Sequence, residues 1–171
     1  MNNNKRLAII AQDLCEYALE REDIKWIADT VPASAGHSQS KLEYELQLLK
    51  IITVGWSISF CLGNDPAKEK TAGIFWKNVN EVSGGLSQAT SLFIGKDIDY
   101  FSEIRTRLDR YVLAVSSAKG DNPAIAIGPE FASHFGNPED LCASLAGSKM
   151  FMAAFAGVRQ YLQAAGFKVA A

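Results

Sequence analysis

The order of hydrophobic and polar positions is most informative between Ser40 and Leu62. Most positions in this stretch are apolar, and the few polar side chains recur at helical spacing, on one narrow stripe of an α-helix. A helix that is apolar around most of its circumference must be covered on several sides. The pattern therefore predicts a central buried helix at about residues 41–62. The polar stripe consists of Glu43, Gln47, Lys50, Thr53 and Ser57.

The start of this helix and its surroundings can also be predicted. Ser40 and Glu43 have the spacing of a capping box, which predicts Ser40 as the residue that caps the helix. A membrane span is the competing interpretation, because Leu46 to Leu62 approaches the necessary length. Lys50 near the middle would cost about 2.5–3.5 kcal/mol on insertion, and we expect no second comparable apolar run to pack against this one. These features favour a soluble core helix and no membrane contact.

Helical periodicity predicts further helices on both sides of the central one. The first covers residues 4–21, with Asn3 or Asn4 as its cap, and a short helix follows from Asp23. The later ones cover about residues 66–94, 98–117 and 138–165. The chain is therefore predicted to be all-α, a single compact domain over residues 1–171 with five to six main helices packed around the central one.

Two regions leave alternatives open. The predicted helix at residues 66–94 contains Gly84-Gly85, and each interior glycine costs up to about 1 kcal/mol relative to alanine. We expect a bend, a close backbone contact or a break at this pair. Proline and glycine limit residues 119–136 to short helical pieces, with 124–127 as the one candidate for extended structure. The residues of the 66–94 helix expected to face inward are Thr71, Phe75, Val79, Val82, Leu86, Ala89 and Phe93.

Composition narrows the class of protein. The net charge of −2 argues against a general nucleic-acid binder, which normally carries an excess of basic residues. Cys15, Cys61 and Cys142 are odd in number, far apart and at apolar helix positions, which is typical of reduced, buried thiols in a cytoplasmic protein. The first ten residues lack the pattern of a signal peptide. A cytoplasmic location is the prediction, and a secretion route without a signal stays open.

Candidate catalytic chemistry is sparse. Ser38 with Lys41, and Ser116 with Lys119, match Ser-x-x-Lys, but about one match is expected by chance and the partner motifs of that chemistry are absent. The two histidines, His37 and His134, lie outside the usual zinc-binding motifs. We therefore predict no catalytic residue, no metal site and no cofactor, although an enzyme whose site is assembled from scattered residues is a third alternative.

The densest basic cluster is the predicted site of interaction. Arg105, Arg107 and Arg110 fall on the helix at 98–117, and arginine forks recognise carboxylates and phosphates. The favoured function is thus a non-enzymatic adaptor, regulator or inhibitor that binds another protein, with a homodimer also compatible with the sequence. The alternative is a small-molecule-binding domain with an apolar pocket between helices, to which Trp26, Trp56 and Trp76 would contribute.

Overall fold

The computed structural model describes residues 2–118 and 122–169. In these ranges the chain forms seven α-helices and one short 3-10 helix and contains no strand, which confirms the all-α fold. Five helices are long and two, α2 and α6, are short. Their bounds are α1 Asn3–Leu19, α2 Glu22–Asp29, η1 Ala33–Ala35, α3 Gln39–Leu62, α4 Ala67–Ile94, α5 Tyr100–Ser117, α6 Ala124–Ser133 and α7 Leu141–Ala164.

Helix α3 lies at the centre of the core, as predicted. It contacts α1, α2, α4, α5 and α7, and one buried hydrophobic cluster joins residues from all seven helices. Gly55 allows α4 to approach α3, because a Cβ at this position would lie 2.2 Å from the Trp76 ring. Phe60 differs from the expectation: it is 41% exposed, since it lies in the last turn of α3, where it stacks on Trp56.

The polar stripe of α3 is mostly buried, and each of its buried members has a partner. Gln47 donates to the carbonyl of Ala18 at 2.7 Å, which ties α3 to the end of α1. The hydroxyls of Thr53 and Ser57 donate to carbonyls one turn earlier in α3 itself. The stripe therefore satisfies the rule that buried polar groups are hydrogen-bonded.

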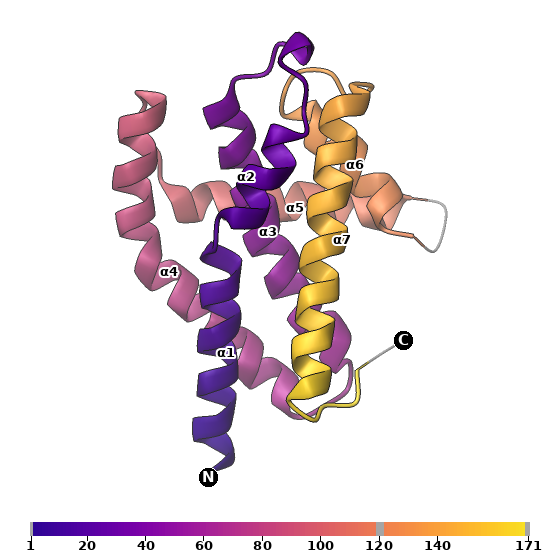
Figure 1. Cartoon of the computed structure of the whole chain (residues 1–171). Helices are drawn as coiled ribbons and strands as arrows, with labels where there is room; N and C mark the ends of the chain where they lie inside the picture. Colours follow the sequence, from indigo (N-terminus) through magenta and orange to yellow (C-terminus); the bar gives the residue numbers. More distant parts are fainter. Residues whose placement is uncertain (1, 119–121, 170–171) are drawn as a thin grey trace.

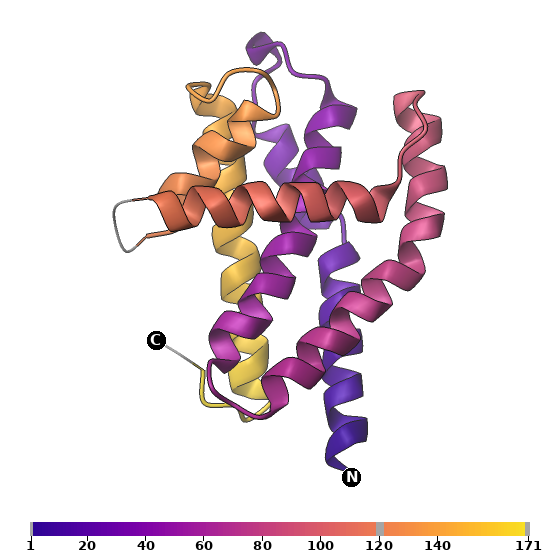
Figure 2. The ribbon, with the colours of Figure 1, turned by 180° about the vertical axis from the view of Figure 1, so that it is seen from behind.

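The long helices are arranged in two directions. Figure 1 shows α1, α3 and α7 running roughly upright, with α7 beside α3. Helix α5 crosses α3 on the opposite side of the molecule, where Figure 2 shows it in front. Helix α6 packs on both α5 and α7 and so closes the angle between them. This crossing of α5 over α3 forms the candidate site described below.

Helix α4 is continuous through Gly84-Gly85, and it changes direction along its length (Figures 1 and 2). No other group lies within 4 Å of a Cβ built at either glycine, so the predicted close backbone contact is wrong and so is the break. Thr71, Phe75 and Val79 are buried as expected. In the second half, Leu86 is half-buried against the core, but the prediction is wrong for Val82, Ala89 and Phe93, which are exposed.

Several local predictions need correction. Ser38 caps α3 in place of Ser40, and Asn2 caps α1 in place of Asn3 or Asn4. Residues 124–127 belong to α6 and are helical. Cys15 and Cys61 are buried thiols, but Cys142 is only half-buried. The end predicted for the last helix agrees with the structure within one residue, but α7 begins at Leu141 with Asp140 as cap, later than the predicted start at residue 138.

Two helices, α3 and α7, have the length and apolar composition that a membrane crossing requires. The expectation of a single run of this kind is therefore wrong. In α3, 83% of the apolar segment is buried inside the protein, whereas in α7 the figure is 39%. The core helix of a soluble protein meets the same criteria, and the burial of α3 fits that interpretation. The absence of membrane contact stays a prediction.

Candidate functional site

The three arginines of the predicted interaction patch have different surroundings. Arg107 points inward and forms a two-bond ion pair with Glu45 of α3, at 3.0 and 2.8 Å. Its side chain is 17% exposed and that of Glu45 is 3% exposed. Arg107 also lies 3.4 Å from Glu103, which is one turn earlier on α5 at i,i+4 spacing. The carboxylates raise the pKa of Arg107, so this guanidinium is a fixed charge between α3 and α5.

Arg110 and Arg105 lie further out on α5. Arg110 reaches α6, where it pairs with Glu130 at 2.7 Å and donates to the hydroxyl of Ser133 at 2.9 Å. Arg105 is exposed, and within residues 2–118 and 122–169 it has no ion pair, although Asp109 follows it at i,i+4 spacing. The structure thus brings Arg107 and Arg110 into contacts within the fold and leaves Arg105 on the surface.

His134 lies in the polar cluster between α5 and α6. Its side chain is 2% exposed, and its Nε2 is 3.7 Å from Glu130 and has no hydrogen-bond partner in the described chain. Nδ1 is 3.5 Å from Arg110, which can only donate, so Nδ1 acts as the acceptor. Burial, with added repulsion from Arg107, Arg110 and Lys41, lowers the pKa of His134 to about 3. The ring is therefore neutral at physiological pH.

The remaining candidates for catalysis do not form a recognisable site. His37 Nε2 bonds to Asp140 at 2.8 Å and its ring packs on Phe135, so it joins the loop before α3 to the cap of α7. Ser38 contacts Ser40, whereas the ammonium of Lys41 lies over the Phe135 ring. Lys119 of the second Ser-x-x-Lys match is outside the described residues. In the part of the chain that the structure describes, no three His, Cys, Asp or Glu side chains are placed to hold a metal.

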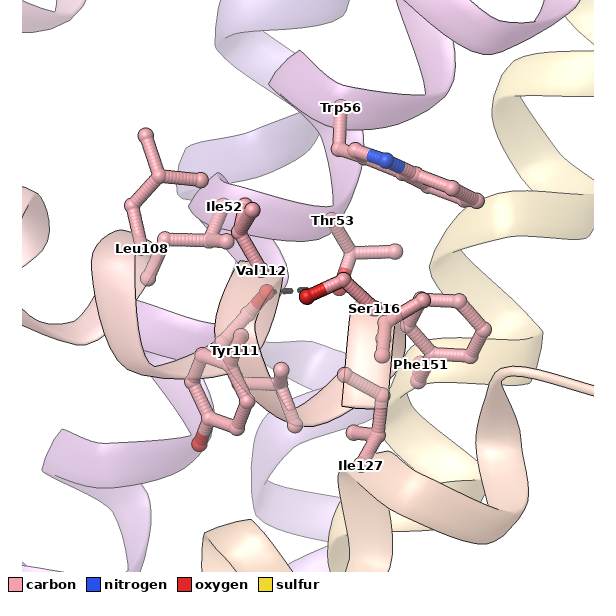
Figure 3. A pocket seen from close by; sticks show the side chains of 11 residues that line it. Ile52, Thr53, Trp56, Leu108, Tyr111, Val112, Ser116, Ile127 and Phe151 are labelled. Carbon is pink, nitrogen blue, oxygen red and sulfur yellow. Dashed lines mark hydrogen bonds between the residues drawn. The ribbon is translucent and has the colours of Figure 1, made fainter. Parts of the chain in front are cut away.

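An apolar pocket lies where α5 crosses α3, bounded also by α6 and α7 (Figure 3). Its volume is about 180 Å³. Trp56 and Phe151 form walls on one side of it, and Leu108 lies on the other (Figure 3). Val112 is 50% exposed at its edge, so the pocket communicates with the surface along α5. The lining residues are Leu49, Ile52, Thr53, Trp56, Leu108, Tyr111, Val112, Val115, Ser116, Ile127 and Phe151.

The hydroxyl groups of the pocket are already used within the protein or turned away from the cavity. Thr53 donates to the carbonyl of Leu49 at 2.8 Å, and Ser116 donates to the carbonyl of Leu113 at 3.0 Å. The hydroxyl of Tyr111 points away from the middle of the pocket, and it is buried without a partner in the described chain (Figure 3). Among the residues that the structure describes, no charged side chain lines the cavity. The pocket therefore suits a molecule that needs no hydrogen bond or counter-charge.

The sequence analysis named one residue that lines this pocket, but it did not predict where in the fold the pocket lies. Of the three tryptophans considered for a ligand site, only Trp56 lines the cavity. Trp26 is 65% exposed, and Trp76 packs against Phe75 and Gly55. The apolar spacing on the predicted helices could indicate that the lining residues face inward, but it carries no information on where facing side chains fail to fill the space between them.

Comparison of the chain with protein-family models gave no match, and comparisons with curated proteins and with solved structures gave none either.

Proposed function

We propose that the protein binds a small apolar molecule in the pocket between α3, α5, α6 and α7. The observation that carries the proposal is a cavity with an almost entirely apolar wall and an edge at the surface. Such pockets are the usual form of a small-molecule site, with polar groups few in number. Within the described part of the lining, donors are few and no side chain is charged, which favours a neutral, hydrophobic ligand over an acid or an amine.

The size of the pocket limits the ligand. A dry cavity of about 150 Å³ lined by aliphatic and aromatic side chains binds benzene, and the present cavity has a volume of about 180 Å³. A single aromatic ring or a short branched alkyl chain therefore fits without rearrangement of the core. Trp56 and Phe151 add aromatic faces, which favour an aromatic ligand through offset or edge contacts.

Calorimetric titration with benzene and indole tests the proposal. For ligands of this size we expect a Kd on the order of 0.1–1 mM, because the gain per atom is limited. Benzoate should bind at least tenfold more weakly, since its carboxylate would be desolvated without a partner. The proposal is wrong if neither benzene nor indole binds, or if benzoate binds as tightly as they do.

Two neighbouring substitutions on α5 provide a matched control. Val112→Trp places a large ring at the pocket edge and should abolish binding. Leu113→Trp adds the same ring at a position that is 66% exposed and outside the pocket lining, and should leave binding unchanged. Thermal unfolding of both variants checks that they fold. Equal binding by wild type and Val112→Trp would place the ligand elsewhere.

Binding of another protein is the second proposal, and the outer face of α5 supports it. Arg105, Asp109 and Leu113 follow one another at i,i+4 spacing and are exposed, with α5 lying across the outside of the molecule (Figure 2). A partner with acidic and apolar groups would match Arg105 and Leu113. In a pull-down, the double variant Arg105→Glu/Leu113→Glu should lose a partner that the control variant Lys77→Glu retains. Sedimentation of the chain alone tests whether the partner is a second copy of the chain. A partner equally retained by both variants contradicts this role for α5.

A further inference from the structure

A second pocket lies at the end of the molecule that carries the N-terminal turn of α1. It is formed by the first residues of α1, the start of α4 and the segment that follows α7. Figure 1 shows these three elements at the lower end of the molecule, away from α6. The volume of this second pocket is about 560 Å³. It shares no residue with the apolar pocket at the crossing of α5 and α3.

The charge of the second pocket is opposite in sign to that of the whole chain. The chain has a net charge of −2, whereas the described part of the lining contains the cations Arg6, Lys70 and Lys168 and a single carboxylate, Asp65. Asp65 accepts a hydrogen bond from the amide of Ala67 at 2.8 Å, so it caps α4. Between residues 2 and 118 and between 122 and 169, none of the three cations forms an ion pair.

Two of these cations are held in place by neutral groups. Arg6 donates to the carbonyl of Ala165 and lies 5.1 Å from the centre of the Phe167 ring. Lys70 donates to the side-chain oxygen of Asn4 at 2.6 Å. These contacts position the side chains without neutralising them, because their acceptors carry no charge. The first turn of α1 adds a partial positive charge of the same sign.

We propose that this second pocket binds a small oxyanion, with phosphate and carboxylate groups as the shared chemistry. The guanidinium of Arg6 offers a planar fork to an oxyanion, and Lys70 and Lys168 supply mobile point charges beside it. An anion here relieves the repulsion among three like charges, which Asp65 offsets only in part because it forms an ion pair with none of them within the described residues. The volume accommodates an anion with several charged groups, such as pyrophosphate or a tricarboxylate.

The test is titration calorimetry of the whole chain with pyrophosphate and with citrate, against sodium chloride of equal ionic strength. We expect saturable binding of at least one of the two anions and none of chloride at that concentration. Tighter binding of pyrophosphate identifies phosphate as the preferred group, and tighter binding of citrate identifies carboxylate. The site does not exist if neither anion binds beyond the effect of ionic strength.

Charge-neutral variants locate the site. Lys168→Gln removes a cation that makes no hydrogen bond within the described chain, so folding should be unaffected, and the affinity should fall about three- to fivefold. Arg6→Gln should weaken binding further, although it also removes the contact with Ala165. Lys77→Gln, on the same helix as Lys70 but 73% exposed and outside the pocket, is the control and should bind as wild type does. An equal loss in Lys77→Gln and Lys168→Gln would show nonspecific attraction and overturn the proposal.

Discussion

Glu45 of α3 and Arg107 of α5 form the two-bond ion pair that joins the two helices where they cross. Both side chains are largely buried, whereas Arg105 and Arg110 on the same helix are exposed. Arg107 immediately precedes Leu108 on α5, and Leu108 lines the apolar pocket. The orientation of α5, and with it the shape of the pocket, therefore depends on this contact.

Substitution of one partner of this pair should be strongly destabilising. Arg107→Met leaves the carboxylate of Glu45 buried and without its counter-charge, which costs about 3–5 kcal/mol in buried pairs. The free energy of unfolding in urea measures the loss. Glu45→Met combined with Arg107→Met should recover most of it, because no isolated charge then remains. Arg105→Met, on the exposed face, should change stability by no more than about 0.5 kcal/mol. A loss of that small size in Arg107→Met would show that Glu45 reaches water.

His134 should make the stability of the fold depend on pH. Its pKa is lowered to about 3 in the folded chain, whereas an unfolded histidine titrates near pH 6.5. Between these values the unfolded state binds a proton that the folded state does not, so stability falls as pH falls below about 6.5. The contribution of His134 between pH 7 and pH 5 is about 2 kcal/mol.

The measurement is urea unfolding of the wild type and of His134→Phe across this range. The variant keeps an aromatic ring beside Tyr111, with which His134 now makes an edge contact, and it cannot titrate. The wild type should lose about 2 kcal/mol more than the variant between pH 7 and pH 5. The other ionisable groups are common to both proteins, so the difference between the two pH profiles isolates the contribution of His134. Parallel pH profiles would mean that His134 is accessible and titrates normally.

The close contact between α6 and α7 should not tolerate a methyl group. A Cβ at Gly147 would lie 2.5 Å from the Cβ of Phe131, an atom close to the backbone that cannot move aside easily. Gly147→Ala should therefore destabilise the fold by about 2 kcal/mol through overpacking. Gly73→Ala is the control, because nothing lies within 4 Å of a Cβ there and the position is exposed within α4. This control should stabilise by about 0.5–1 kcal/mol, by helix propensity alone. Thermal unfolding distinguishes the two, and similar Tm values would show that α6 can shift.

The helices themselves could largely be predicted from periodicity, since apolar spacing in α1, α3 and α7 indicates both the structure and the buried face. In α4 the same spacing predicts which face is apolar but not whether another helix covers it. Phe75 and Phe93 have equivalent positions in the pattern, yet the first is buried and the second is 79% exposed. Coverage depends on where the chain places the helices that contact α4, which are α1, α3 and α5.

The candidate sites could not be predicted in the same way, because their members come together only through the tertiary fold. Arg107 has the same sequence environment as Arg105 and Arg110, and only its partner Glu45, 62 residues earlier, makes it structural. The basic pocket combines Arg6 with Lys168 from opposite ends of the chain. Neither relationship can be recognised from the sequence, because its members are far apart along the chain. The net charge of the chain also gives no indication of the basic pocket, because acidic residues elsewhere in the chain outnumber the basic ones.

Lys50 provides the last prediction, because it is fully buried and yet should be easier to replace than Arg107. Its ammonium contacts Asp23 and the carbonyl of Glu20, each at 2.9 Å, and lies over the ring of Tyr17. Glu20 is exposed and the side chain of Asp23 is 30% exposed, so water can reach both acceptors once the lysine is gone. Lys50→Met keeps the buried aliphatic chain and should cost only about 1–2 kcal/mol. Lys50→Ala also leaves a void and should cost more, about 2–5 kcal/mol. Urea unfolding of both variants and of Arg107→Met checks the order of these losses in the free energy of unfolding. A loss in Lys50→Met as large as in Arg107→Met would mean that Asp23 stays charged and shielded from water without its partner.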